Sequence, residues 1–198
     1  MYSTDISGVV LAGGRGSRLG GEDKGLVDVN SRPMISYCIE RFAPQVSTLF
    51  INANRSLTTY RELGFPVITD QVADFAGPLA GIAAALSSCK TSYLATVPCD
   101  SPFLPTDLVE RLASPLQDSQ AAVSVAISGG RPQPVFAVIA TQLYESLYDY
   151  LTSGGRKIMT WYRQQTIVEV DFGPDDSPFA NINSPADLAT AAKQLPVQ

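Results

Sequence analysis

The sequence predicts an α/β protein with a mostly parallel central sheet, helices on both of its faces and a mixed edge region. In the first half, short apolar runs rich in valine alternate with helix-like stretches, which is typical of βαβ units. These runs are continuously apolar, as expected for strands that are covered on both faces. In the second half, two strand-like runs follow each other directly through "GGRPQ", and this indicates the mixed edge.

The first half contains four expected strands and three expected helices. The strands are the apolar runs at residues 6–12, 48–53, 67–68 and 93–97. The helix-like stretches between them cover residues 34–42, 57–63 and 79–86, and Pro33 and Pro78 stand before the first and the last of these. Proline is favoured at a helix start, where its missing N–H is not needed.

The second half predicts strands at residues 121–128 and 134–140, helices at 142–151 and 157–163, and a strand at 166–172. Ser184 and Pro185 then open a final helix as N-cap and first-turn proline, with Asp187 near its positive end. No linker, low-complexity segment or internal repeat divides the chain. We therefore expect one domain over residues 1–198.

Composition and charge exclude several classes of protein. The chain has 198 residues, 45% of them hydrophobic, which is enough for one sizeable core. No apolar run is long enough to span a bilayer, and "MYSTDISG" lacks the basic start of a signal peptide, so a cytoplasmic protein without membrane contact is expected. The net charge of −5 argues against a nucleic-acid partner.

The cysteines and the missing histidines narrow the chemistry further. Cys38, Cys89 and Cys99 are odd in number and widely spaced, which argues against a disulfide framework or a zinc site. The chain has no histidine, so histidine-based triads and histidine-ligated zinc are excluded. Any catalysis must use carboxylates, Lys, Arg, amides and a hard cation.

A glycine-rich segment follows the first expected strand. "GVVLAGGRGSRLGGEDKGL", from Gly8 to Leu26, holds seven glycines and the cations Arg15, Arg18 and Lys24. It matches neither G-x-G-x-x-G nor the Walker pattern. Glycines at the carboxyl end of a strand still let backbone N–H groups approach an anion, and three cations would balance a triphosphate. The alternative is a surface loop whose charges are solvated.

Other polar residues follow or interrupt the expected strands. Asp100 directly follows the strand at 93–97 and suits Mg²⁺, which takes one or two carboxylates plus phosphates and waters. Asp70 ends the strand at 67–68, and Asn52 interrupts an apolar strand. Asn181 and Asn183 alternate in an extended segment, so their side chains share one face. The alternatives are turns, a cross-strand hydrogen bond and helix capping.

Two further segments carry weaker signals. "GPLAGI" (77–82) opens a helix with small residues that allow close approach, either to a ligand or to the sheet. Arg156 and Lys157 in "SGGRKIM" would suit an anionic acceptor or a solvated helix start, and the second interpretation is slightly favoured.

"LAGGRGSRLGGEDKGL" resembles the signature L-A-G-G-x-S-x-R-M-G-x-D-K of the molybdenum cofactor guanylyltransferase family, within the wider nucleotidyltransferase group. It departs from that signature at Leu19, where the family has methionine, and by one extra residue in the glycine loop. Five further segments are similar and occur in the family's order: "INANR", "VITD", "GPLAGI", "PCDSPFLPTDL" and "NINSPADL". The resemblance covers nearly the whole chain.

The resemblance implies a single Rossmann-like nucleotidyltransferase domain, with a nucleotide-binding half at 6–100 and an acceptor-binding half at 101–198. It implies that the catalytic residues are Arg15, Arg18, Lys24 and Asp100, and that Asp100 holds Mg²⁺. The implied nucleotide-binding residues are Leu11, Ala12, Gly13, Gly14, Lys24, Asn52, Asp70 and Asp100. The implied acceptor-binding residues are Gly77, Pro78, Leu79, Gly81, Asn181 and Asn183.

The resemblance also implies a reaction, the transfer of GMP from GTP to the terminal phosphate of molybdopterin with release of pyrophosphate. A phosphate monoester has a second pKa of about 6, so the nucleophile is already deprotonated and no histidine base is needed. The implied partners are GTP, molybdopterin and, transiently, other cofactor-synthesis or molybdoenzyme-delivery proteins. A monomer is expected.

Two alternatives remain open at the level of sequence. One is a related nucleotidyltransferase that uses CTP or another phosphate acceptor, such as a sugar phosphate; the double glycine of "LAGG" favours the guanylyl family. The other is a non-catalytic GTP-binding module. Lys24, Asp70 and Asp100 together argue against such a module, because a binding protein has little need for a metal carboxylate.

Overall fold

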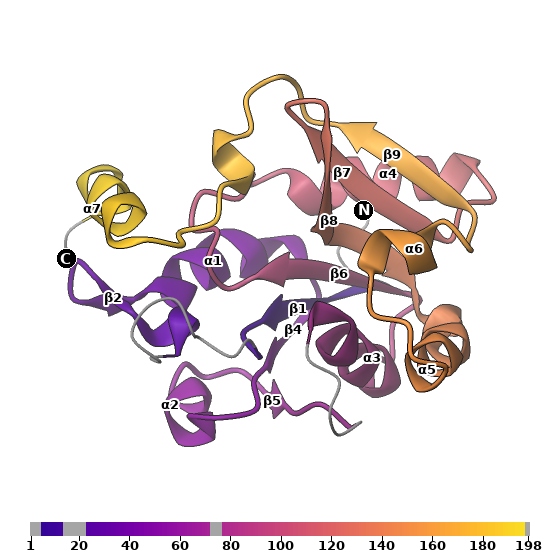
Figure 1. The fold of residues 1–198 in the computed structure, drawn as a ribbon, viewed down its shortest axis with the longest axis horizontal. Coiled ribbons are helices and arrows are strands. Elements are labelled where there is room, and N and C mark those ends of the chain that lie inside the picture. Colours follow the sequence, from indigo (N-terminus) through magenta and orange to yellow (C-terminus); the bar gives the residue numbers. More distant parts are fainter. Residues whose placement is uncertain (1–4, 14–22, 72–76, 197–198) are drawn as a thin grey trace.

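The computed structural model describes residues 5–13, 23–71 and 77–196, and its centre is a twisted sheet (Figure 1). The described part of this sheet has seven strands in the order β5-β4-β1-β6-β8-β7-β9. In chain order they are β1 (Ile6–Leu11), β4 (Thr48–Asn52), β5 (Val67–Ile68), β6 (Tyr93–Pro98), β7 (Val123–Ser128), β8 (Arg131–Ala140) and β9 (Ile167–Asp171). A separate hairpin pairs β2 (Asp28–Val29) with β3 (Arg32–Pro33).

The helices are distributed along the whole chain. The described α-helices are α1 (Met34–Phe42), α2 (Leu57–Arg61), α3 (Pro78–Ser88), α4 (Leu108–Asp118), α5 (Tyr144–Thr152), α6 (Ile158–Tyr162) and α7 (Pro185–Gln194). Helices separate most of the strands of the sheet, while β7 and β8 follow each other directly. The α/β class predicted from the sequence is confirmed.

The strand directions explain both the parallel sheet and its mixed edge. β1 pairs in parallel with β4 and with β6, and β4 pairs in parallel with β5. β8 runs antiparallel to both β6 and β7, whereas β9 is again parallel to β7. From β1 the chain goes first to β4 and β5 on one side and then returns to β6 on the other. Open α/β sheets bind ligands at such a reversal of strand order.

Helices cover both faces of the sheet because the side chains of each strand alternate between them. On β1, Ile6 and Val10 pack with α1 and α4 on one face. Val9 and Leu11 pack with α3, α5 and α6 on the other face. Figure 1 shows α3 and α5 side by side on this second face. The continuously apolar strands are therefore covered on both sides, as the sequence predicts.

The β7–β8 hairpin turns through Gly129 and Gly130. Their φ angles are +57° and +70°, as in the two-residue turns that match the twist of a hairpin and that glycine adopts without strain. β8 extends back to Arg131, so the hairpin is tighter than the predicted strand at 134–140 implies.

Helix α4 was not predicted from the sequence. Pro115 lies inside this helix, and an internal proline removes a helical hydrogen bond, so the pattern argues against a helix there. The apolar side of α4 overrides that local preference, because Leu108, Leu112 and Leu116 are each at most 5% exposed against the sheet. Burial of this size stabilises the helix by roughly 1.5–3 kcal/mol per side chain.

A small third core joins the C-terminal helix to the β2–β3 hairpin. Val29 and Tyr37 pack there with Ile182 and Leu195. The side-chain amide of Asn30 donates to the carbonyl oxygens of Ala192 (2.9 Å) and Leu195 (3.1 Å). Figure 1 shows α7 beside β2. The end of the chain is thereby held against the segment that follows Lys24. None of the described helices is both long and apolar enough to cross a membrane.

The predicted start of the last helix is confirmed as a capping box. Ser184 Oγ accepts a hydrogen bond from the backbone N–H of Asp187 at 3.2 Å. Asp187 Oδ2 in turn accepts from the backbone N–H groups of Ser184 (2.9 Å) and Asn183 (3.0 Å). The N–H of Asn183 is the main reason that the pKa of the Asp187 carboxyl lies below its ordinary value of 3.8.

We predict that Asp187→Asn lowers the melting temperature at pH 7 but not at low pH. A carboxyl whose pKa is lowered in the folded state contributes stability above its unfolded pKa of 3.8 and loses it as the pH falls through the folded value. The difference in melting temperature between wild type and variant should therefore shrink below about pH 3.8. Asp149→Asn, at an exposed position of α5, is the control. An equal difference at pH 7 and pH 3 would contradict the capping role.

Candidate active site

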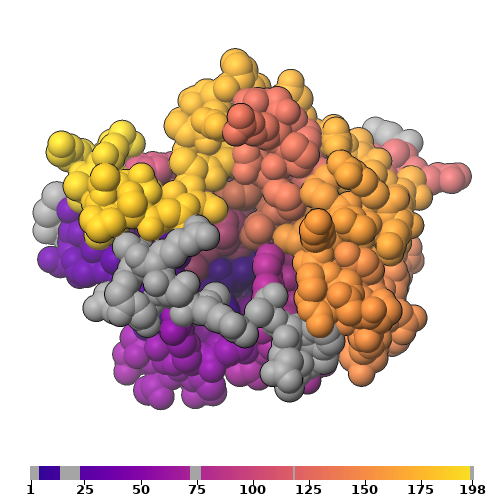
Figure 2. Space-filling model, viewed as in Figure 1, coloured from indigo at the N-terminus to yellow at the C-terminus, as the bar shows by residue number. Residues whose placement is uncertain are grey.

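A cavity of about 270 Å³ lies at the carboxyl ends of the parallel strands. Figure 2 shows this face hollowed in its middle, with the indigo atoms of the N-terminal strand at the floor of the hollow. Seven of the predicted nucleotide-binding residues line the cavity: Leu11, Ala12, Gly13, Lys24, Asn52, Asp70 and Asp100. Gly14, Arg15 and Arg18 lie outside the described residues.

The predicted acceptor-binding residues divide into two groups. Gly77, Pro78 and Asn181 line the cavity, together with Pro98, Cys99 and Val135, which the sequence analysis did not select. Leu79 is packed into the core between α3 and the sheet. Gly81 and Asn183 lie next to cavity residues, as described below. Val135 and Asn181 show that the second half of the chain also contributes to the cavity.

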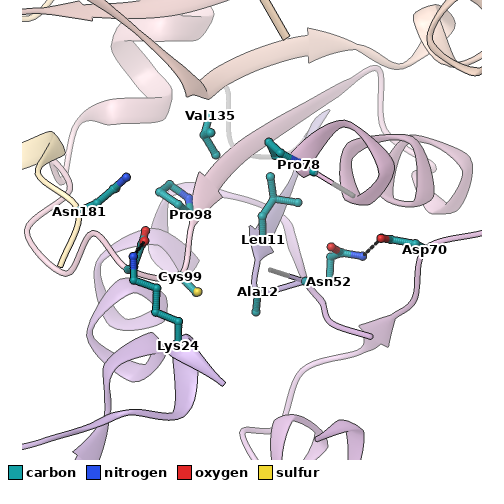
Figure 3. A pocket seen from close by; sticks show the side chains of 13 residues that line it. Leu11, Ala12, Lys24, Asn52, Asp70, Pro78, Pro98, Cys99, Val135 and Asn181 are labelled. Atoms are coloured by element: carbon teal, nitrogen blue, oxygen red, sulfur yellow. Dashed lines mark hydrogen bonds and ion pairs between the residues drawn. The ribbon is translucent and has the colours of Figure 1, made fainter. Parts of the chain in front are cut away.

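Lys24 and Asp100, which both line the cavity, form an ion pair. Figure 3 shows the Lys24 side chain at one side of the cavity, opposite Asn52 and Asp70. Lys24 begins a short 3-10 turn, Lys24–Leu26, and its ammonium contacts Asp100 Oδ2. It also donates to Asn183 Oδ1 at 2.6 Å, across 159 positions of the sequence. The structure thus brings together three predicted residues. Lys24 comes from the glycine-rich segment, Asp100 follows β6, and Asn183 lies in the segment before α7.

The backbone around Asp100 is tied to the C-terminal segment. Its carbonyl oxygen accepts from the N–H of Ile182 at 2.9 Å. The hydroxyl of the next residue, Ser101, donates to Asn181 Oδ1 at 2.7 Å. These two bonds hold Asn181 and Asn183 beside the carboxylate.

One oxygen of Asp100 has no hydrogen-bond donor among the described residues. Asp100 is 8% exposed, and its Oδ1 is buried without a partner, while Oδ2 contacts Lys24. A buried carboxylate oxygen without a partner is costly and therefore unusual in folded proteins. Among the described residues no group of three or more acidic, Cys or His side chains could enclose a metal ion. A hard cation bound at Oδ1 would therefore need further oxygen ligands from a substrate or water.

A second polar cluster lies across the cavity, at the ends of β4 and β5. Asp70 Oδ1 accepts from the amide of Asn52 at 2.9 Å, and Oδ2 accepts from the amide of Asn54 at 2.8 Å. The backbone N–H of Asp70 donates back to Asn54 Oδ1 at 2.9 Å. Figure 3 shows Asn52 and Asp70 facing each other. The carboxylate is therefore held by two amides in one orientation.

Asn54 is a site residue that was not predicted from the sequence. The signal was present in "INAN", because alternation along a strand places Asn52 and Asn54 on the same side. Only Asn52 was selected, since Asn54 lies just beyond the apolar run. Asn54 is exposed, unlike Asn52, which is 2% exposed.

Two predicted glycines make room for Asn52. A Cβ atom on Gly81 would lie 2.2 Å from Asn52 Oδ1, and one on Gly13 would lie 3.0 Å from the same atom. Gly81 therefore packs directly against the Asn52 side chain, which lines the cavity.

Cys99 lines the cavity but is not a reactive thiol at neutral pH. Burial raises the pKa of Cys99 well above its ordinary value of 9.0, and burial also raises that of Cys38. The Cys38 thiol donates to the carbonyl oxygen of Cys99 at 3.3 Å. All three cysteines are free in the structure.

The structure favours a structural role for Arg156. Its guanidinium donates to the carbonyl oxygens of Leu151 (3.0 Å) and Gly155 (2.7 Å) and so closes the C-terminal end of α5.

The family of the chain follows from comparison with known proteins. The model of the MobA-like NTP transferase domain matches residues 8–168. The chain belongs to this family. This chain is 48% identical to the molybdenum cofactor guanylyltransferase of Ralstonia nicotianae over 97% of its length and 98% of the relative. It is 50% identical to that of Bordetella petrii over 98% of both chains.

A solved structure shows the same fold. The molybdopterin-guanine dinucleotide biosynthesis protein A of Archaeoglobus fulgidus superimposes with a TM-score of 0.77 at 24% identity. The match covers 95% of this chain and 97% of the Archaeoglobus fulgidus chain. The family predicted from the glycine-rich segment and the five further motifs is confirmed.

We predict that Gly81→Ala destabilises the protein, although Gly→Ala in a helix normally stabilises by about 1 kcal/mol. The new Cβ would overlap Asn52 Oδ1, and overpacking of this kind costs about 1–3 kcal/mol. In an Asn52→Ala background the same substitution should cost at least about 1 kcal/mol less, since the closest overlapping side chain is gone and only Leu11 Cδ2, at 2.9 Å, remains too close. Urea unfolding of the four proteins measures both effects. Equal effects in the two backgrounds would contradict the packing role of Gly81.

Proposed function

We propose that this chain transfers GMP from GTP to the terminal phosphate of molybdopterin and releases pyrophosphate. The observation that carries the proposal is the Lys24–Asp100 pair, whose buried Oδ1 lacks a donor among the described residues and lies at the reversal of strand order. Relatives about half identical over nearly their whole length are named molybdenum cofactor guanylyltransferases, which supports the choice of substrates.

The reaction requires no proton transfer from the attacking group. A terminal phosphate oxygen of the acceptor forms a bond to the α-phosphorus of GTP. The bond between that phosphorus and the oxygen bridging to the β-phosphate breaks, and pyrophosphate leaves with the electron pair. A phosphate monoester is largely dianionic at neutral pH, so catalysis consists of positioning and charge neutralisation. A chain without histidine can supply both.

Lys24 is suited to neutralise charge on the triphosphate. Its ammonium enters the cavity from the end of the glycine-rich segment, and it is held there by Asp100 and Asn183. Interactions that strengthen as charge develops on the leaving oxygen lower the barrier directly. The proposal assigns Arg15 and Arg18 to the same triphosphate.

The cluster of Asn52, Asn54 and Asp70 is suited to hold the nucleoside. Each Asp70 oxygen accepts one hydrogen bond from an amide and keeps capacity to accept another. Hydroxyl and N–H donors of a ribose or base match such acceptors. The cavity therefore has a cation-bearing side and an acceptor-rich side, as a nucleoside triphosphate requires.

The described residues fit one Mg²⁺ ion bound together with the substrate. Asp100 Oδ1 is the protein ligand that such an ion would take, and phosphate oxygens and water would supply the others. When bound, Mg²⁺ supplies positive charge to the phosphate oxygens. We propose Mg²⁺ dependence on this basis.

We predict that Asp100→Asn and Lys24→Met each lower kcat by at least about two orders of magnitude, because each removes charge aimed at the reacting phosphates. Pyrophosphate release from Mg-GTP and molybdopterin measures this, and chelation of Mg²⁺ should abolish it. Lys193→Met, at an exposed position of α7, is the control and should retain wild-type activity.

Three outcomes of this assay would contradict the proposal. One is a wild-type protein that binds GTP but releases no pyrophosphate with molybdopterin, as a non-catalytic module would. Another is Asp100→Asn with wild-type activity. The third is preference for CTP over GTP when the four nucleoside triphosphates compete. A cytoplasmic location, a monomeric state and transient contacts with cofactor-synthesis or delivery proteins stay predictions.

A further inference from the structure

We propose that Asp23, held by Tyr60 and Arg55, is a positioning residue that directs Lys24 into the cavity. The three side chains are here called the Asp23 anchor. The predicted effect of the anchor on kcat rests on the proposed function. Its effect on the position of Lys24 can be measured without any enzymatic activity.

Asp23 is a buried carboxylate outside the cavity lining. Asp23 is 9% exposed and directly precedes Lys24 in the sequence. Oδ1 accepts a hydrogen bond from the Tyr60 hydroxyl at 2.6 Å, and Oδ2 lies 3.5 Å from Arg55 Nε. Both oxygens therefore face partners from the segment after β4, some thirty residues further along the chain.

The Asp23 side chain is not used as an ordinary helix cap. Asp23 stands at the N-cap position of the turn Lys24–Leu26, where an aspartate normally accepts from the backbone of the turn. No such bond is made by its side chain. The backbone of Asp23 closes the turn instead, since its carbonyl oxygen accepts from the N–H of Leu26 at 2.8 Å. The side chain thus ties the start of this turn to Tyr60.

The residue after Lys24 leaves room for the anchor. A Cβ atom on Gly25 would lie 2.6 Å from the Tyr60 hydroxyl oxygen and 3.4 Å from Cys99 Sγ. Only a glycine at this position lets the hydroxyl reach Asp23 unchanged. In the tripeptide Asp23-Lys24-Gly25, the catalytic lysine therefore follows the residue that Tyr60 holds. It precedes a glycine, whose missing side chain leaves space for the Tyr60 hydroxyl.

The Tyr60 hydroxyl remains a donor under all ordinary conditions. Tyr60 is fully buried, and burial, followed by the hydrogen bond to Asp23, raises its pKa far above the ordinary value of 10.0. The bond to Asp23 is therefore a hydroxyl-to-carboxylate bond, which is short and stronger than one between neutral groups.

The anchor also connects the two sides of the cavity. Arg55 directly follows Asn54, which holds Asp70. Through Asp23, the segment that carries Asn52 and Asn54 is linked to the turn that carries Lys24. A substitution in the anchor should therefore change the position of the Lys24 side chain more than it changes the packing of the core.

Tyr60→Phe tests the proposal, because it removes one oxygen and keeps the buried ring. Without the anchor Lys24 should leave Asp100 more often, and its amine should be acetylated at least about threefold faster than in wild type, with the exposed Lys193 as internal reference. Peptide mass spectrometry measures both rates. Tyr162→Phe is the matched control, since that buried hydroxyl donates to the carbonyl oxygen of Pro134 at 3.1 Å in another part of the fold.

Pyrophosphate release gives the second measurement. Tyr60→Phe should lower kcat by about tenfold or more, with a smaller change in KM for GTP. The double variant with Lys24→Met and Tyr60→Phe should have the same kcat as Lys24→Met alone, because the anchor acts on catalysis only by positioning the Lys24 ammonium group. A merely structural role predicts the same loss in both backgrounds.

The two measurements separate this proposal from the proposed function. A wild-type protein that releases no pyrophosphate would overturn guanylyl transfer, and the acetylation rates would still decide on the anchor. Unchanged acetylation of Lys24 in Tyr60→Phe would overturn the anchor, as would equal losses of kcat with and without Lys24. If Tyr60→Phe does not fold, Arg55→Lys, whose side chain is 38% exposed in wild type, replaces it in both measurements.

Discussion

The pairing of β1 with β4 on one side and with β6 on the other is the constraint on which the site depends. Since these strands are parallel, their carboxyl ends meet at one edge of the sheet. Gly13, Asn52 and Asp100 follow or end these three strands, so they meet there although 87 positions separate Gly13 from Asp100. The reversal of strand order leaves space between the helices at this edge, and the cavity occupies it.

Each carboxylate of the site and of the Asp23 anchor has at least one polar or charged partner. Asp70 is held by amides, Asp23 by a tyrosine and an arginine, and Asp100 by Lys24. Burial of carboxylates is tolerated only when such partners are present. Two buried carboxylate oxygens have no hydrogen-bond donor among the described residues, Asp23 Oδ2 and Asp100 Oδ1. Asp23 Oδ2 lies 3.5 Å from Arg55 Nε, and Asp100 Oδ1 belongs to a residue that lines the cavity. The proposed Mg²⁺ site uses Asp100 Oδ1, in a cavity that also contains the ammonium group of Lys24.

The third core explains why residues near the end of the chain reach the site. The β2–β3 hairpin and α7 bury apolar side chains against each other, and Asn30 is bonded to the end of α7. The capping box then fixes the start of the same helix, directly after Asn183. The contact between Asn183 and Lys24 is therefore stabilised in two ways. The third core packs α7 against the hairpin that follows Lys24, and the hydrogen bonds of the capping box hold the backbone at Asn183.

The sequence by itself determined the fold class, most strands and helices, the last helix cap and the family. These depend on local patterns, namely apolar runs, glycine, proline and cap residues, and on motifs that are contiguous in the chain. It did not predict α4, because Pro115 opposes a helix locally and burial against the sheet outweighs that preference.

Only the tertiary structure decided which polar residues become partners. The sequence placed Lys24, Asp100 and Asn183 among the candidates, but their contact spans up to 159 positions and follows from strand order and the third core. Asn54, Tyr60 and Arg55 were not selected at all, since a polar residue after a strand or a tyrosine in a short helix has no distinctive local pattern. Their roles arise from three-dimensional contacts, in which a buried carboxylate requires a donor from wherever the fold can bring one.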